Sequence, residues 1–213
     1  NLNKIKELKY INLEYNECDK NYIDELIDYI NLSSEEITNF FSIDSFNPKV
    51  DIKLYYDIDK FNKWYYYFNK KEAPLWFCGF SFKMNGVYHI NVLSLEKYKK
   101  TQGHEKHNLN NLKCLIMHEF VHSCVLKINN SSLPAWLNEG IAIKLSHQYD
   151  NKEYKFNASL NEMINGCNNY INYYTMFSYA LDKYGKDYIL DLILNNKAFD
   201  ETEKLYNDLL KSM

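Results

Sequence analysis

The chain has 213 residues and a formal net charge of −3, with 46% hydrophobic and 25% charged residues. This composition is typical of a globular protein, and because no apolar run approaches about 20 residues we exclude an integral membrane segment. All 25 basic residues are lysines, so the planar arginine fork that best binds phosphates and guanines is missing. A nucleic-acid partner is therefore excluded as well.

The five cysteines form no C-x-x-C pair and their number is odd. A disulfide framework or a cysteine-type zinc site is thus not expected, and free thiols favour a reducing compartment such as the cytoplasm. Because the chain begins at Asn1 and not at Met, a removed leader, and with it secretion, stays open.

Hydrophobic periodicity predicts sheet-forming and helical segments in the first half of the chain. Ser33 followed by Glu36 is a capping-box signature and predicts that a second helix begins there. Asn85-Gly86 between two apolar runs predicts a hairpin turn. The predicted strands are 10–15, 50–57, 75–82 and 87–95, and the predicted helices are 21–30, 33–41 and 59–68.

The second half of the chain is predicted to be helical. Amphipathic patterns cover 109–126 and 134–147, and four shorter helical patterns follow. We therefore expect an α+β fold in one domain, 1–213, with a sheet-containing lobe (1–127) and a helical lobe (128–213). A cleft between two such lobes is a natural place for a site.

The motif with the most chemical content is H-E-x-x-H, formed by His118, Glu119 and His122. On a helix, positions i and i+4 differ by about 40° around the axis, so both imidazoles point to the same side. Two neutral imidazoles are suitable zinc ligands, and a catalytic zinc needs a third protein ligand and one open position. Glu119 is then placed to take a proton from the attacking water.

Glu139 is the candidate for the third ligand, seventeen residues after His122. It lies on the predicted helix 134–147, in the apolar sequence Trp136-Leu137-Asn138-Glu139-Gly140-Ile141. An unpaired charge would be costly in such surroundings, whereas a carboxylate there completes a His₂Glu set.

H-E-x-x-H followed by W-L-N-E-G-x-A resembles the gluzincin branch of zinc metallopeptidases, and within it the small bacterial peptidase MA-like domain. The resemblance implies a zincin-like fold with its cleft between the lobes. It also implies that Zn²⁺ is bound by His118, His122 and Glu139, that Glu119 is the general base, and that the substrate is a peptide or protein held along the edge strand of the sheet.

Family members often add a tyrosine that stabilises the oxyanion. Counting back from Tyr184-Gly185 favours Tyr170 for this role, with Tyr173 and Tyr174 as rivals. Asn138, beside Glu139, is expected either to orient that ligand or to have a local capping or surface role.

The chain departs from aminopeptidases of this clan, whose G-x-M-E-N segment holds the free amine of the substrate. The corresponding region, 79–85, has no glutamate. An endopeptidase is therefore the better fit than an aminopeptidase.

Other functions stay open at this stage. The zinc framework alone is compatible with a non-catalytic peptide- or protein-binding module, and with a hydrolase of a non-peptide amide. His104 and His107 lie in a polar stretch before the zinc helix; we expect solvated loop histidines there, with a second metal site as the alternative.

Overall fold

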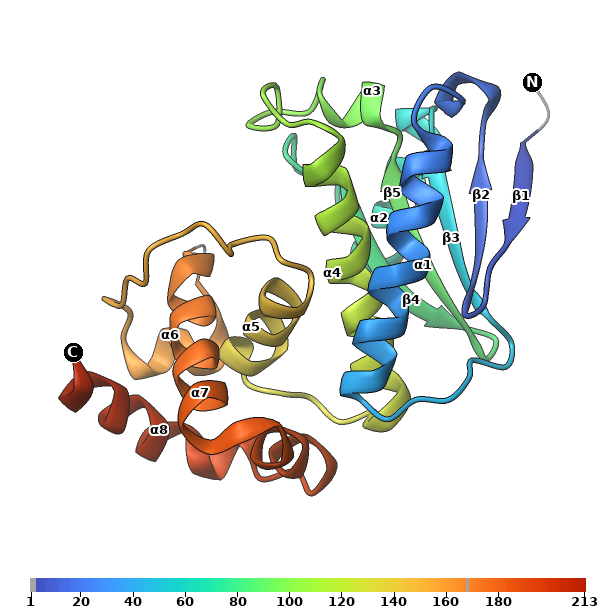
Figure 1. Cartoon of the computed structure of the whole chain (residues 1–213). Helices are drawn as coiled ribbons and strands as arrows, with labels where there is room; N and C mark the ends of the chain where they lie inside the picture. Colours follow the sequence, from blue (N-terminus) through green and yellow to red (C-terminus); the bar gives the residue numbers. More distant parts are fainter. Residues whose placement is uncertain (1–2, 168) are drawn as a thin grey trace.

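The computed structural model describes residues 3–167 and 169–213 and has an α+β architecture (Figure 1). The N-terminal part is a mixed five-stranded sheet with helices, and the C-terminal part is helical. The strands are β1 (Lys4–Glu7), β2 (Ile11–Tyr15), β3 (Val50–Tyr55), β4 (Gly79–Met84) and β5 (Val87–Leu93). The helices are α1 (Ile23–Phe40), α2 (Ile58–Asn69), α3 (Leu95–Tyr98), α4 (Leu109–Ile128), α5 (Ala135–Leu145), α6 (Leu160–Asn165), α7 (Tyr170–Leu194) and α8 (Ala198–Ser212), with a short 3₁₀ turn at Glu17–Asp19.

The strand order is β1-β2-β3-β5-β4. The three central strands, β2, β3 and β5, are parallel, and each edge strand is antiparallel to its neighbour. The β4–β5 hairpin is confirmed: Asn85 and Gly86 have φ values of 52° and 81°, as a type I′ turn requires. The first strand of this hairpin, β4, forms one edge of the sheet.

The two faces of the sheet are covered by different helices. Val50, Ile52 and Leu54 alternate along β3, so these three buried side chains share one face of the sheet. Helices α1 and α4 lie together on one side of the sheet (Figure 1). Tyr55 points to the other face, where it contacts Phe61 of α2. Helix α2 therefore covers one face of the sheet and α4 covers the other (Figure 1).

The first long helix differs from the prediction. Ser33 does not begin a second helix; it is buried within the single helix α1. Leu26, Ile30 and Ile37 keep one apolar face across this point, and the Ser34 hydroxyl bonds to the carbonyl oxygen of Asn31 at 3.2 Å. A local capping signature was therefore overridden by burial of a continuous apolar face.

The strand predictions also differ from the structure in two places. Residues 75–76 form a tight turn, with Phe77 N donating to Pro74 O at 3.0 Å, so β4 begins only at Gly79. Strand β1 was not predicted because all four of its side chains are exposed, and the sequence therefore shows no apolar alternation there.

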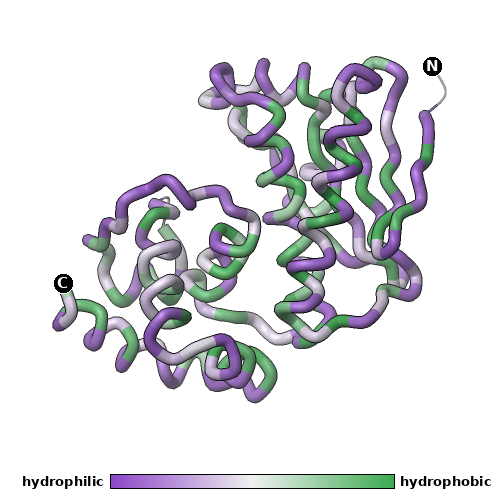
Figure 2. The backbone as a smooth tube through the Cα atoms, in the orientation of Figure 1, coloured by the Kyte–Doolittle hydropathy of each residue, from purple (hydrophilic) through white to green (hydrophobic). Residues whose placement is uncertain are grey.

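In the helical part, α5 packs against α7, and Trp136 of α5 donates a buried hydrogen bond to Thr202 of α8 at 2.9 Å. Helix α7 is broken at Gly185, which has a φ of 81°. Within the described part of the chain, α5 is followed by α6, the two segments of α7, and α8, where four shorter helical patterns were predicted. Hydrophobic and hydrophilic residues alternate along the helices (Figure 2), and no helix within the described residues is long and apolar enough to cross a membrane.

Candidate metal centre

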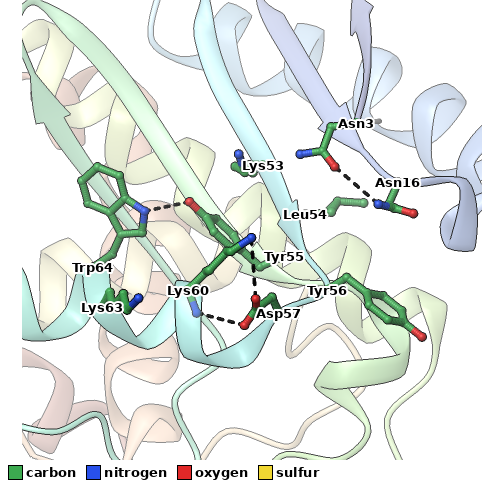
Figure 3. Close-up of a pocket in the computed structure, with 10 residues that line it drawn as sticks. All are labelled: Asn3, Asn16, Lys53, Leu54, Tyr55, Tyr56, Asp57, Lys60, Lys63 and Trp64. Atoms are coloured by element: carbon green, nitrogen blue, oxygen red, sulfur yellow. Dashed lines mark hydrogen bonds and ion pairs between the residues drawn. The ribbon is translucent and has the colours of Figure 1, made fainter. Parts of the chain in front are cut away.

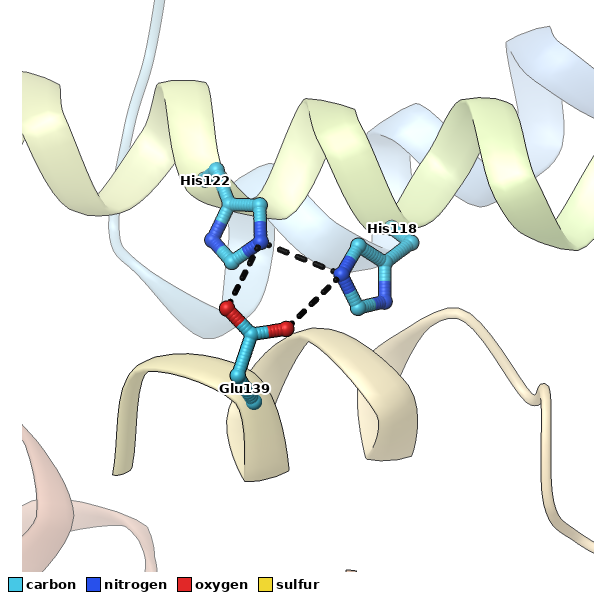
Figure 4. A group of neighbouring side chains, drawn as sticks. All are labelled: His118, His122 and Glu139. Carbon is cyan, nitrogen blue, oxygen red and sulfur yellow. Dashed lines mark hydrogen bonds and ion pairs between the residues drawn. The ribbon is translucent and has the colours of Figure 1, made fainter. Parts of the chain in front are cut away.

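Helix α4 presents the two candidate imidazole ligands. It begins after Asn108, whose side chain caps the helix in a reciprocal capping box with Asn111. One turn separates His118 from His122, both of which lie on the side of α4 that faces α5 (Figure 4). The ring centroids are 4.7 Å apart and the two Nε2 atoms 3.1 Å apart.

Glu139 of α5 completes the group. Its Oε2 lies 3.3 Å from His118 Nε2 and its Oε1 lies 3.7 Å from His122 Nε2. The three ligand atoms all lie within 4.8 Å of one another, and no other cluster of three His, Cys, Asp or Glu side chains within residues 3–167 and 169–213 has such an arrangement. The structure therefore brings together all three side chains that the sequence singled out as ligands.

The close packing of α5 on α7 sets the position of Glu139. Its neighbour Gly140 lies so near α7 that an added Cβ would be 2.6 Å from Phe177 Cβ and 2.7 Å from the Tyr173 carbonyl oxygen. Only glycine fits there, and the absence of a side chain lets α5 approach α7 while Glu139 points towards α4.

Two amide side chains hold the ligands in place. His118 Nδ1 donates to Gln148 Oε1 at 2.8 Å, which leaves the Nε2 lone pair directed at the other ligands. Asn138 Nδ2 donates to Glu139 Oε1 at 3.1 Å, the orienting contact expected as one of its two alternatives. Gln148 was not predicted, because it follows α5 and no periodicity or motif connects it to His118.

The electrostatics of the group reflect its burial. Burial alone would raise the pKa of Glu139, but its hydrogen bond with His118 and the positive charges of both histidines lower that pKa to about 2. Burial would lower the pKa of His118, yet the neighbouring carboxylates raise it above its usual value. The pKa of His122 is lowered, by burial and then by repulsion from His118. At a pH where His118 is protonated and no ion is bound, its Nε2 lies 3.3 Å from Glu139 Oε2 and the two groups form an ion pair.

This donor set fits a divalent metal ion. Two nitrogen ligands at about 2.0–2.1 Å from one tetrahedral ion are roughly 3.3 Å apart, close to the observed Nε2–Nε2 separation of 3.1 Å. The tautomer fixed by Gln148 leaves an unprotonated Nε2 on neutral His118, as ligation requires. Two imidazoles and a carboxylate suit zinc well.

Glu119 lines a groove beside the three ligands. The groove has a volume of about 480 Å³ and also contains His122 and Asn138. Phe80 and Ser81 of the edge strand β4 also line this groove. The remaining lining residues are Val125, Leu126, Ser131, Ser132 and Leu133. The candidate base thus faces a space bounded by both parts of the molecule.

Tyr170 lies near the third ligand, Glu139. It shares a hollow of about 440 Å³ with Glu139, Gly166 and Cys167 and is 40% exposed. Burial, together with the negative charges of Glu139 and Glu119, raises the pKa of Tyr170 to about 12. The phenol therefore stays protonated near neutral pH and is able to donate a hydrogen bond.

Both rival tyrosines have contacts of their own, although Tyr173 lines the same hollow as Tyr170. The Tyr173 hydroxyl donates to the carbonyl oxygen of Cys167 at 2.7 Å and accepts from its amide nitrogen. Tyr174 is buried against Tyr149, with the Lys144 ammonium 5.2 Å from its ring centroid.

The loop histidines before α4 are not simply solvated, and that expectation is wrong. His104 and His107 are only partly exposed, with their Nδ1 atoms 3.0 Å apart. His107 Nδ1 is 2.7 Å from the Tyr98 hydroxyl, and His104 Nε2 donates to Trp76 O at 3.1 Å. These contacts fasten the loop to α3 and to the segment before β4.

A further concavity, of about 630 Å³, lies on the α2 side of the sheet (Figure 3). The Trp64 indole donates to the Tyr55 hydroxyl at 2.7 Å in its wall. Lys53, Lys60 and Lys63 also line it. It shares no residue with the metal group, so it is a separate feature.

Comparisons of the chain with protein-family models, with curated proteins and with solved structures found no match. The relationship to gluzincins thus stays a prediction from the motifs, and the functional argument depends on the geometry of the site.

Proposed function

We propose that the protein is a zinc-dependent peptidase that cuts within polypeptide chains. One observation carries the proposal: His118, His122 and Glu139 converge within 4.8 Å of one another, next to a groove lined by Glu119. A structural zinc would normally have four protein ligands, whereas a three-ligand set leaves a position for water or substrate.

The three ligands would hold the ion, which supplies Lewis acidity for activating water and polarising a carbonyl group. Glu119 takes the proton of the attacking water and passes it to the leaving amine. Its place beside the ligand His118, with its side chain in the groove, supports this role. Asn138 and Gln148 hold the ligands in one orientation during the reaction.

Tyr170 donates a hydrogen bond to the negatively charged oxygen that develops on the scissile carbonyl. The hollow that it shares with Glu139 supports this assignment, and so does its raised pKa, which keeps the donor proton in place. A donor directed at developing charge is more effective in a partly buried site than in water.

The edge strand β4 aligns the substrate. Phe80 and Ser81 of this strand line the Glu119 groove, and an extended peptide adds to such an edge through main-chain hydrogen bonds. The region 79–85 has no acidic side chain for a free amine, which favours cleavage inside a chain over removal of an N-terminal residue.

The proposal is tested with the purified protein, unfolded polypeptides and a chelator. We expect chelator-sensitive cleavage at internal bonds, restored by Zn²⁺, and a loss of about 10²–10⁴-fold in Glu119→Gln with metal still bound. Glu105→Gln, on the loop before α4, is the matched control and should keep full activity. Capture of peptides without cleavage would instead support a non-catalytic module, and cleavage of non-peptide amides alone would support a different hydrolase.

A further inference from the structure

Exposed apolar side chains are concentrated at the end of α2 and in the loop that follows it. Tyr66 and Tyr67 are each 57% exposed, Leu75 is 76% exposed and Trp76 is 59% exposed. All four lie within eleven consecutive residues. Large apolar side chains gathered in this way are typical of a surface that meets something other than water.

The same segment is basic. Residues 60–76 contain four lysines and one glutamate, a net charge of +3 in a chain whose total is −3. Lys63 shares the outward face of α2 with Tyr66 and Tyr67, because residues three and four positions apart lie on one side of a helix. Lys70 follows directly as the C-cap residue of α2. The Lys70 ammonium lies 5.1 Å from the Tyr67 ring centroid.

Contacts between aromatic rings hold this segment in place. Phe77 contacts Tyr65 with ring centroids 4.5 Å apart and Phe61 with centroids 5.1 Å apart, so the turn at Leu75 and Trp76 is held beside α2. The resulting aromatic–lysine surface is formed by Lys63, Tyr66, Tyr67, Lys70, Leu75 and Trp76. Because these contacts hold the turn beside α2, binding requires little ordering of the main chain.

We propose that the aromatic–lysine surface binds an anionic lipid bilayer. Tyrosine and tryptophan have an apolar body and a polar tip, and they prefer the level of the lipid headgroups. Lysines near the bilayer are attracted by anionic headgroups. Leu75 and Trp76 project from a tight turn, a shape that suits insertion between headgroups better than the concave seat that a folded protein partner needs.

The concavity of Figure 3 supports the same partner. Three lysines line this hollow of about 630 Å³ beside α2: Lys53, paired with Glu14 at 2.7 Å, Lys60, paired with Asp57 at 3.8 Å, and Lys63. Lys63 belongs both to this hollow and to the aromatic–lysine surface, so the two features adjoin. A phosphate-bearing headgroup has the charge to be attracted to Lys63, at the rim that the two features share, when the surface rests on the bilayer.

The proposal is tested by co-sedimentation with vesicles of phosphatidylcholine alone and of phosphatidylcholine with phosphatidylglycerol. We expect binding to the anionic vesicles only, weakened at high salt because the charges are screened. Lys63→Glu with Lys70→Glu should weaken binding about 30-fold or more, from the loss of two lysine attractions. Leu75→Ser with Trp76→Ser should weaken it at least about 10-fold.

A control variant and a second readout distinguish a loss of membrane binding from misfolding of a variant. Phe199→Ser with Lys211→Glu makes the same kind of change on α8 and should bind like the unaltered protein. Trp76 fluorescence should shift to shorter wavelength on binding and be quenched by brominated lipid chains, and Trp76→Phe should lose that signal. Neither co-sedimentation nor fluorescence requires metal or hydrolysis, so both readouts are independent of the peptidase proposal.

Several results would overturn the membrane assignment. The first is equal binding to neutral and anionic vesicles, and the second is no binding to either kind of vesicle. The third is unchanged binding of the Leu75→Ser, Trp76→Ser variant to anionic vesicles. Retention by soluble polyglutamate without vesicle binding would assign the surface to an acidic protein.

Discussion

His118 donates its Nδ1 hydrogen to Gln148 Oε1 at 2.8 Å, across a separation of 30 residues. This contact fixes the ring orientation and the tautomer, so Nε2 is the atom that meets Glu139 and His122. The precision of the candidate centre therefore depends on a residue outside the H-E-x-x-H motif.

Replacing Gln148 with Leu should weaken metal binding about 10–100-fold, because the ring of His118 loses its partner. The measurement is a competition titration of the metal-free protein with a chromophoric zinc chelator. Gln102→Leu, on the loop before α4, should leave the affinity unchanged. Equal affinities for both variants would contradict an orienting role for Gln148.

Glu139→Ala should remove most of the bound metal. We expect near-stoichiometric zinc in the purified protein and a loss of affinity of at least about 100-fold on substitution, since the metal would keep only two protein ligands. Elemental analysis after dialysis measures this directly. The third-ligand assignment fails if Glu139→Ala retains zinc as well as Glu153→Ala, a change in the loop after α5.

Gly140→Ala should destabilise the protein by about 1–3 kcal/mol, because the new methyl group overlaps Phe177 and the Tyr173 carbonyl oxygen. Displacing α5 also moves Glu139, so zinc affinity should fall in parallel. Urea unfolding and zinc titration provide the two measurements. Gly103→Ala, where an added Cβ meets nothing within 4 Å, should cost only backbone strain and leave zinc binding intact.

Tyr170→Phe should lower kcat about 10²-fold or more with little change in KM or zinc content, because an oxyanion donor acts mainly in the transition state. Tyr174→Phe, whose ring is packed away from the site, should keep its kcat. If Tyr170→Phe turns over like the unaltered protein, the oxyanion donor is a different group.

The metal-free protein should lose most stability from Glu139→Gln at mildly acidic pH. The pKa of Glu139 is lowered to about 2, so its contribution is present above the unfolded value near 4.5 and is lost as the pH falls towards 2. The pKa of His118 is raised, so its contribution is present below about 6.5 and is lost as the pH rises through the folded value. Thermal unfolding of both proteins should therefore differ most between about pH 4.5 and 6.5. A difference independent of pH would exclude the buried ion pair.

Local signals predicted what depends on local chemistry. One-turn spacing on α4 placed His118 and His122 on one side, and Asn85-Gly86 set the hairpin. Both features need only a few neighbouring residues. The partly buried position of Glu139 was likewise predictable, because its neighbours in the sequence are apolar.

Features that depend on tertiary contacts were missed. Gln148 reaches His118 only because α5 folds back on α4, and the serines of α1 lie within a helix because its apolar face is covered. Strand β1 is held by backbone pairing with β2 and leaves no mark in its exposed side chains. In each case the deciding interaction joins residues distant in sequence or involves only the backbone.

The candidate ligands come from two different parts of the chain. His118 and His122 belong to the helix that lies on the sheet, and Glu139 belongs to the helix that packs on α7. An ion held by all three would act as a cross-link between the two parts, across the connecting residues 129–134. Amide hydrogen exchange far from the ion, in α7 and in the sheet, would then slow whenever the cross-link is present.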